Sequence, residues 1–416
     1  MSNLSNFKFN NSKNCCLAPY TTLNFDTMGY MRVCCYNSEF ILGKYPDNSI
    51  VEAWSNASRN KFIQSLKQLK FPKGCEDCKR QIVENNVQNA LFTSFDYLDS
   101  YHDISDVYPV ALNFDFGNIC NYECIMCGGK WSSSIRKNRE KLPALKTPYD
   151  DQFVEQLRKF IPKLKFANFL GGEPFLNGIY YKIWDLMAEL NPDIHINITT
   201  NGSVYNSKIE SYLKKFNSCT ITISLDSINE STYAFIRKNG NLKTVLENLE
   251  KFKALGKMRG IAVCPMIQNV YEMPQLVEFC IEHGLSLYIN DVTGHLGGKL
   301  KGIHEGEFSN SSVWTGKDSS KEEVNVNNDT LIPEVALNTL TKKELQTILD
   351  YLTKFSFIEH YHLHDKYESF LNTIRHYVNQ KPTFNELIKT HVCSLFRKGS
   401  LSEKIYILKE LYKSCF

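Results

Sequence analysis

The sequence predicts an α/β protein whose centre is an incomplete (β/α)6 barrel, that is, a partial TIM barrel. Three observations predict this class. Between Val110 and Asp291, short apolar runs alternate with helix-like patterns, which is typical of successive βα units around a parallel sheet. Six of the 14 cysteines lie within the first 108 residues, in a region rich in turns. From about residue 333 onward the pattern is helical.

We therefore expect four segments. Residues 1–108 should form a small cysteine-rich domain, and residues 109–292 the partial barrel. Residues 293–332 are polar and lack periodicity, which predicts a loop or lid. Residues 333–416 should form a helical extension that begins with a capping box at Thr341 and Glu344 and contains a second one at Ser400 and Glu403.

Six apolar runs bounded by turn residues are the expected strands of the barrel. The helix before the fifth strand has the clearest pattern, because Leu242, Val245, Leu249 and Phe252 fall on one face. In barrels of this kind the chemistry lies in the loops at the carboxyl ends of the strands. The expected strands are Ala111–Phe116, Lys165–Leu170, His195–Thr199, Thr220–Leu225, Gly260–Ile267 and Leu285–Asn290.

Composition excludes some classes of protein. Lys and Arg number 48 against 45 Asp and Glu, so bulk charge gives no reason to expect nucleic acid or an anionic membrane as a partner. No apolar run approaches the ~18 residues needed to span a bilayer, and the first residues do not form a signal peptide. We expect a cytosolic protein, where many cysteines indicate metal ligation or catalysis.

Three cysteines, Cys120, Cys124 and Cys127, follow the first expected strand in a glycine-containing loop. Three thiolates within eight residues can hold three corners of a [4Fe-4S] cluster, whose irons are normally ligated by four cysteines. One iron would then stay open, as a catalytic metal requires. A zinc site, or cysteines that merely line a core, are the alternatives.

This CxxxCxxC loop resembles the signature of the radical S-adenosylmethionine (SAM) superfamily, and the resemblance extends over Ala111 to Asp291. It implies that the open iron binds SAM, and that cleavage of SAM yields a 5′-deoxyadenosyl radical that takes a hydrogen atom from the substrate. Met126 stands where the superfamily usually has an aromatic residue beside the adenine.

The sequence Gly171-Gly172-Glu173-Pro174 resembles the superfamily's GGEP motif. The resemblance implies that Glu173 contacts the SAM ammonium group, with the glycines allowing close approach of the backbone. It further implies contacts to SAM from polar groups after the later strands, with the arginine placed to bind the carboxylate. These residues are Asn201, Ser224 and Arg237. Gln268 and Asn290, which are polar residues after the fifth and sixth expected strands, are further candidates to contact the ribose or adenine of SAM.

A second set of cysteines lies in the N-terminal region. From spacing alone, a closed four-cysteine site suits a second [4Fe-4S] cluster and a structural zinc about equally. Gly29-x4-Cys34 resembles the twitch and SPASM domains that hold auxiliary clusters in radical SAM enzymes, which favours iron. Cys15 and Cys35 compete with their neighbours as ligands. The favoured ligands are Cys16, Cys34, Cys75 and Cys78.

The function we expect is radical SAM chemistry on a peptide or protein side chain, helped by the auxiliary cluster. Dehydrogenation or epimerisation of a carbohydrate or small metabolite is the alternative, and a non-catalytic iron–sulfur or zinc sensor is a third possibility. A reductase such as flavodoxin or ferredoxin would supply the electron. Three further cysteines should be buried and inert, namely Cys219, Cys264 and Cys280.

Overall fold

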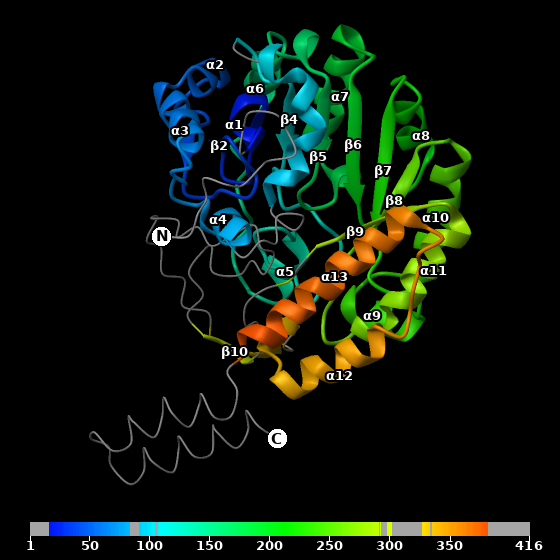
Figure 1. Ribbon diagram of the computed structural model, residues 1–416. Helices are drawn as coiled ribbons and strands as arrows, with labels where there is room; N and C mark the ends of the chain where they lie inside the picture. The colour runs from blue at the N-terminus through cyan, green and yellow to red at the C-terminus, as the bar shows by residue number, and fades with distance from the viewer. Residues whose placement is uncertain are drawn as a thin grey trace.

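A nine-stranded sheet forms the centre of the molecule (Figure 1). The strand order is β3-β2-β1-β4-β5-β6-β7-β8-β9, so the strands from β4 onward follow one another as they do in the sequence. The computed structural model describes residues 16–83, 91–104, 107–290, 292, 298–301, 327–332 and 335–381.

The six strands of the predicted barrel are present, and every neighbouring pair among them is parallel. This confirms the parallel α/β class. The fifth strand is the one whose bounds differ most, since it begins and ends earlier than the sequence predicts. The strands are β4 (Ala111–Phe114), β5 (Phe166–Phe169), β6 (His195–Thr200), β7 (Cys219–Ser224), β8 (Met258–Val263) and β9 (Ser286–Ile289).

A helix lies in each connection between these strands, as parallel pairing requires. In α10 the residues Leu242, Val245, Leu249 and Phe252 are buried, which confirms the predicted face. The helices are α5 (Ser133–Asn138), α6 (Asp151–Leu157), η4 (Ile161–Lys163), η5 (Pro174–Leu176), α7 (Gly178–Leu190), α8 (Ser207–Leu213), α9 (Glu230–Ile236), α10 (Leu242–Ala254), η6 (Val270–Glu272) and α11 (Met273–His283).

The N-terminal region continues the same sheet. Strand β1 pairs in parallel with β4, and β2 and β3 follow as antiparallel neighbours, so residue 108 does not mark a boundary of the sheet. Helices α2 and α3 lie beside these strands (Figure 1). The elements are α1 (Ala18–Thr21), β1 (Thr22–Phe25), β2 (Tyr30–Arg32), β3 (Ile41–Lys44), α2 (Ile50–Trp54), α3 (Ala57–Lys67), α4 (Glu76–Val83) and η3 (Leu91–Ile104).

The two faces of the sheet differ in chemistry because successive side chains of a strand point to opposite sides. Phe114 stacks on Phe25 and Phe169 at ring-centroid distances of 5.5 and 4.9 Å. Phe153 of α6 packs edge-on against Phe25, and Tyr180 of α7 against Phe169, so this face is the buried one under the helices.

The opposite, inner face carries a chain of hydrogen-bonded amides. Asn197 donates to Asn168, Asn168 donates to Asn113, and Asn113 donates to Asn24, at distances of 2.8, 2.5 and 2.5 Å. Thr220 of β7 extends the chain by donating to Asn197. This amide ladder crosses five neighbouring strands and makes the inner wall polar, which the sequence analysis did not predict.

Two helices of the C-terminal region, α12 (Lys342–Leu352) and α13 (Tyr361–Gln380), pack against each other and against the barrel. The capping box of Thr341 and Glu344 is present, which confirms that prediction. Helix α13 lies against β9 and α11, beside the last strand of the sheet (Figure 1). Ser400 and Glu403 lie outside the described residues. The short helix η7 (Leu337–Thr339) precedes α12.

The predicted polar loop at 293–332 contains two strands where the sequence predicts none. Strands β10 (Gly298–Lys301) and β11 (Asn327–Ile332) pair antiparallel with a register shift. Their sequences lack the apolar alternation by which a strand is identified, because Gly, Lys and Asn dominate them.

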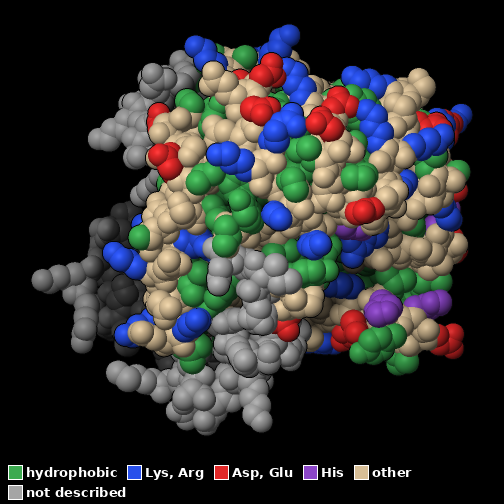
Figure 2. Space-filling view, turned by 90° about the horizontal axis from the view of Figure 1, so that it is seen from above, with side chains coloured by type: hydrophobic (Ala, Val, Ile, Leu, Met, Phe, Trp, Pro, Cys, Tyr) green, Lys and Arg blue, Asp and Glu red, His purple; other side chains and the backbone are tan. Residues whose placement is uncertain are grey.

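The outer surface carries charges of both signs. On the face seen in Figure 2, basic and acidic side chains are intermixed around apolar ones. Within the residues that the structure describes, no helix combines the length and apolar character needed to cross a membrane.

Candidate metal centre and cofactor site

The three-cysteine loop begins six residues after β4 and is tied to the end of α9. Ile125 donates its backbone N–H to Ile236 at 2.9 Å, and Glu123 donates its own to Lys238 at 3.0 Å. Ile125 is also buried in an apolar cluster with Ile236. The loop follows β4 in the sequence, but contacts with the helix that follows β7 hold it in place.

A charged pair beyond α5 braces the same loop. The Arg139 guanidinium donates to the carbonyl oxygens of Cys124, at 3.4 Å, and of Cys127. Glu140 accepts the backbone N–H of Gly129 at 2.7 Å. A Cβ at Gly129 would lie 1.9 Å from the Glu140 carboxylate, so only glycine fits there. These contacts hold the cysteines by their backbone and leave the thiols available.

The thiols fit an iron–sulfur cluster. Cys124 is buried, and Cys120 and Cys127 are half-buried. Burial raises the pKa of Cys124 to about 11, and a bound metal stabilises the thiolate that burial disfavours. Among the described residues, no three His, Cys, Asp or Glu side chains converge on a single point as ligands of one ion do. Cluster cysteines bind separate irons, so they need not converge.

The GGEP segment packs against this loop. A Cβ at Gly172 would lie 2.5 Å from the carbonyl oxygen of Ile119, and Glu173 donates its backbone N–H to the same oxygen at 2.7 Å. The second glycine thus lets the segment approach the cysteine loop, where the sequence analysis expected it to approach SAM. Gly171 has a φ of +75°, which glycine tolerates best.

Glu173 ties the ends of two neighbouring strands together. Its side chain is fully buried, and its carboxylate accepts hydrogen bonds from Thr200 Oγ1, from the Asn201 N–H and from the Phe175 N–H. The bonds from Thr200 and Asn201 join the end of β5 to the end of β6. The expected contact of Glu173 with the SAM ammonium group stays a prediction.

Asn201 lies at the cysteine loop, as expected. Its side-chain nitrogen is 3.9 Å from Cys120 Sγ and donates to Asn121 at 3.0 Å. Ser224, the last residue of β7, is half-exposed on the inner side of that strand. Both residues stand at carboxyl ends of strands, where the resemblance places SAM contacts.

Arg237 also reaches the loop. Its Nη1 lies 4.0 Å from Cys124 Sγ, while its Nε donates to Asp226 at 2.7 Å. Asp226 is fully buried and accepts the Cys264 N–H at 2.7 Å with its other oxygen. The sequence analysis did not assign Asp226 a role. Its position directly after an expected strand, 11 residues before Arg237, was the available signal.

The remaining expected SAM contacts are scattered around the mouth of the barrel. Met126 and Cys264 both pack on the apolar cluster of Ile125. Gln268 is half-buried beyond β8, and Asn290 is exposed beyond β9. Cys264 was expected to be inert, whereas it is half-buried and stands beside Asp226, close to the three-cysteine loop. Cys219 and Cys280 are buried, as expected.

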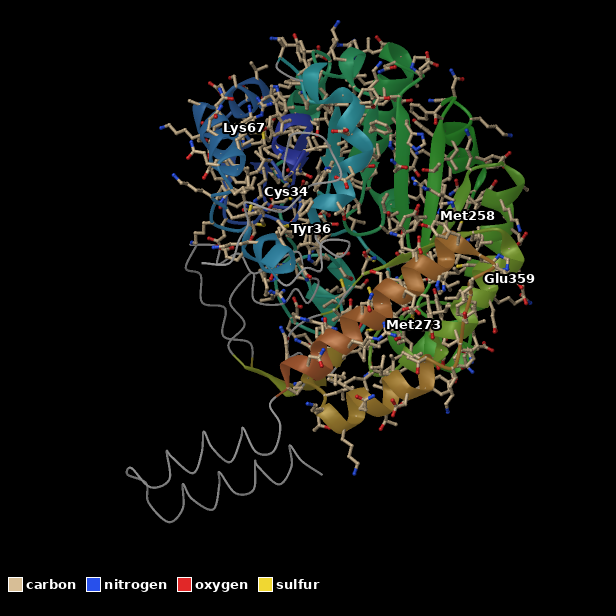
Figure 3. All side chains as sticks on the ribbon, in the orientation of Figure 1. Cys34, Tyr36, Lys67, Met258, Met273 and Glu359 are labelled. Atoms are coloured by element: carbon tan, nitrogen blue, oxygen red, sulfur yellow. The ribbon has the colours of Figure 1, made fainter. Side chains whose placement is uncertain are left out.

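The four N-terminal cysteines line one pocket. It contains Cys16, Cys34, Cys75 and Cys78, together with apolar residues of α3 and η3. Cys35 is exposed and does not line it, which favours Cys34 as the ligand. Figure 3 shows Cys34 and Tyr36 beside α4, the helix that carries Cys78.

Backbone and amide donors already point at the sulfurs of this pocket. The Tyr36 N–H donates to Cys34 Sγ and Asn37 Nδ2 donates to Cys75 Sγ, each at 3.3 Å. Burial raises the pKa values of Cys75 and Cys78 to about 12. Gly74 has a φ of +86° and abuts Asn37, so the glycine before Cys75 is needed. Cys15 lies outside the described residues.

Part of the chain is similar to known proteins. Residues 114–280 match the family model of the radical SAM superfamily. GTP 3',8-cyclase of Mycolicibacterium smegmatis is 29% identical over 180 residues, which are 41% of this chain and 46% of the relative. The radical SAM cyclopropyl synthase TigE of Paramaledivibacter caminithermalis is 29% identical over 160 residues, 34% of this chain and 32% of the relative.

A solved structure, native anSMEcpe with bound AdoMet, is 18% identical with a TM-score of 0.40, over 69% of this chain and 68% of that one. The match covers less than half the length of each of the two curated relatives, GTP 3',8-cyclase and TigE. The matched residues include the three-cysteine loop, the GGEP segment, Asn201 and Arg237. Over residues 114–280, this chain is therefore similar to the radical SAM superfamily of enzymes.

Proposed function

We propose that this chain reductively cleaves SAM and abstracts a hydrogen atom from a substrate bound at the mouth of the barrel. The observation that carries the proposal is the three-cysteine loop, braced by Arg139 and faced by Asn201 and Arg237. Cys120, Cys124 and Cys127 would hold a [4Fe-4S] cluster. When bound, the cluster and SAM supply a 5′-deoxyadenosyl radical.

The chain's own residues prepare this site. Arg237, fixed by Asp226, presents a guanidinium whose remaining N–H groups are suited to a carboxylate such as that of SAM. Asn201 presents an amide beside Cys120. Met126 offers an adaptable apolar contact at the position that the superfamily uses for the adenine.

We further propose that Cys16, Cys34, Cys75 and Cys78 hold an auxiliary [4Fe-4S] cluster in a twitch-like arrangement. Their shared pocket and the N–H groups directed at two of the sulfurs support this assignment. Zinc is the alternative ligand of the same four thiols. An electron donor such as flavodoxin or ferredoxin would serve the first site.

The substrate is proposed only as a class. The relatives give a peptide or protein side chain no support, since GTP 3',8-cyclase is named for a small molecule. We therefore favour a small-molecule substrate, which the sequence analysis held as the alternative, and keep a peptide as the second candidate.

Matched cysteine variants test both sites in the anaerobically reconstituted full chain. The wild type, reduced with dithionite, should convert SAM to 5′-deoxyadenosine and methionine and should contain about eight irons. Joint replacement of Cys120, Cys124 and Cys127 by Ala should abolish cleavage and leave about four irons. SAM cleavage that survives in this triple variant would refute the assignment of the first site.

Two neighbouring cysteines provide the control for the second site. C34A should lose the second set of about four irons, whereas C35A should retain it, because only Cys34 lines the pocket. Iron content and visible absorbance measure this difference. Equal iron content in the two variants, or one zinc per wild-type chain in place of four irons, would contradict an auxiliary iron–sulfur cluster.

A further inference from the structure

Asp115 stands at the inner mouth of the barrel. It directly follows β4, and its backbone N–H donates to Phe25 of β1 at 2.9 Å. Phe114 and Phe116 on either side of it both pack toward the helices, through Phe169 and Tyr149 respectively. Because successive residues alternate between faces, the Asp115 side chain belongs to the inner face, on which the amide ladder lies.

The Asp115 carboxylate is available to a ligand. Within the part of the chain that the structure describes, no hydrogen bond to its oxygens is formed, and the residue is partly exposed. Asp26, at the equivalent position after β1, instead accepts bonds from Met28, Tyr30 and Arg32. The neighbouring strand makes room for the Asp115 side chain, since a Cβ at Gly171 would lie 2.6 Å from its Oδ1.

The surrounding charges set the ionisation of Asp115. Burial and the neighbouring Asp26 carboxylate raise its pKa to about 7, while Lys130 and Arg32 oppose this rise. The carboxylate therefore changes its charge near neutral pH. The titratable and charged groups whose charges interact with Asp115 are Asp26, Arg32 and Lys130, together with Tyr149 and Tyr180 from the helix-covered side of the sheet.

The wall below Asp115 is suited to hydroxyl groups. Asn113 lies two residues before Asp115 on the same face, and Asn168 and Asn197 of the ladder are half-exposed. Asn113 and Asn197 each donate one N–H to a neighbouring ladder amide and have a second N–H that no described residue accepts, whereas Asn168 also bonds the Tyr97 hydroxyl. An apolar substrate would leave these polar groups without partners, which disfavours it.

We propose that Asp115 is a substrate-binding residue, and that it and the amide ladder select a polyhydroxylated amine, the amine at Asp115 and the hydroxyls along the ladder. This inference deepens the proposed function and rests on it, because it places the substrate on the wall beside the GGEP segment and the three-cysteine loop. A carboxylate paired with an ammonium group forms a charge-assisted bond, which discriminates more strongly than a neutral one.

The test compares two probes that differ at one carbon atom. Glucamine carries an amine and five hydroxyls, and the neutral sorbitol carries a sixth hydroxyl in place of the amine. Calorimetric titration of the wild type at pH 8 should show glucamine binding about tenfold more tightly than sorbitol, as a charge-assisted hydrogen bond predicts. The preference should shrink at pH 6, because Asp115 is then mostly protonated and uncharged.

Variants test whether Asp115 causes the preference for glucamine over sorbitol. D115N should lose it, D115E should keep much of it, and D193N, which removes an exposed charge elsewhere, should not change it. Iron content and circular dichroism show whether D115N is folded, and D115E keeps the test valid if it is not. A wild type that binds neither probe, or binds both equally, would overturn the inference, as would a preference retained by D115N. Failure of the wild type to cleave SAM would refute the proposed function instead, because the titration needs no turnover.

Discussion

At the scale of single residues, the cysteine loop is held mainly by groups that do not touch the sulfur atoms. Arg139 binds two carbonyl oxygens of the loop, and Glu140 binds the N–H of Gly129. Both side chains are nearly buried, so their bonds are shielded from competing water. The loop is therefore shaped by the protein before any metal binds, which lowers the entropy cost of ligation.

Loss of the Arg139 brace should loosen the metal site without removing a ligand. In R139A we expect iron to pass to a chelator about tenfold faster than in the wild type, as loss of a charged hydrogen bond implies. R158A, which removes an exposed arginine paired with Glu155 and Glu189, is the control and should release iron at the wild-type rate. Equal release from R139A and R158A would mean that Arg139 does not stabilise the loop.

At the scale of elements, the sequence predicts strands well and their partners poorly. The six barrel strands could be identified because short segments rich in apolar residues, bounded by turn residues, alternate with helix-like patterns. The pairing of β1 with β4 could not be predicted, because it joins residues about 90 positions apart and leaves no local pattern in the sequence. The amide ladder was missed for a related reason. Asn24, Asn113, Asn168 and Asn197 each lie in a different strand, so no local pattern in the sequence links them.

In the candidate site, too, local features could be predicted from the sequence and long-range contacts could not. The cysteines were predicted, because spacing within one loop is visible in the sequence. The hydrogen bonds of Glu173 with Thr200 and Asn201 were not predicted, because a different strand brings these two residues to it. The Asp226–Arg237 pair likewise needed the fold to bring its members together.

The capping box of α12 provides a test at the scale of one element. T341A should lower the free energy of unfolding by about 1 kcal/mol, because the Glu344 N–H loses the Thr341 hydroxyl as its acceptor. T347A lies on the exposed side of the same helix and should change stability by less than about 0.5 kcal/mol. Urea unfolding followed by circular dichroism measures both, and equal losses would show that the cap contributes nothing specific.

At the scale of the whole molecule, one sheet carries both cysteine sites. Cys16 precedes α1 and β1, Cys34 follows β2, and the three-cysteine loop follows β4, which is hydrogen-bonded to β1. Any movement of the N-terminal strands would thus be transmitted to the first strand of the barrel. Helix α13 packs beside the last strand, so both ends of the six-stranded barrel are covered by other parts of the chain.

The central claim is that one iron at the three-cysteine loop has no protein ligand and binds SAM. Cys264 is the thiol placed to compete for that iron, since its backbone is bonded to Asp226 beside Arg237.

The most direct measurement is electron–nuclear double resonance on the reduced cluster with SAM labelled by ¹⁵N in its amino group and ¹⁷O in its carboxylate. We predict hyperfine coupling from both labels in the wild type and equally in C264S. Absence of coupling in the wild type together with its appearance in C264S would show that a fourth cysteine closes the cluster, and would contradict the account.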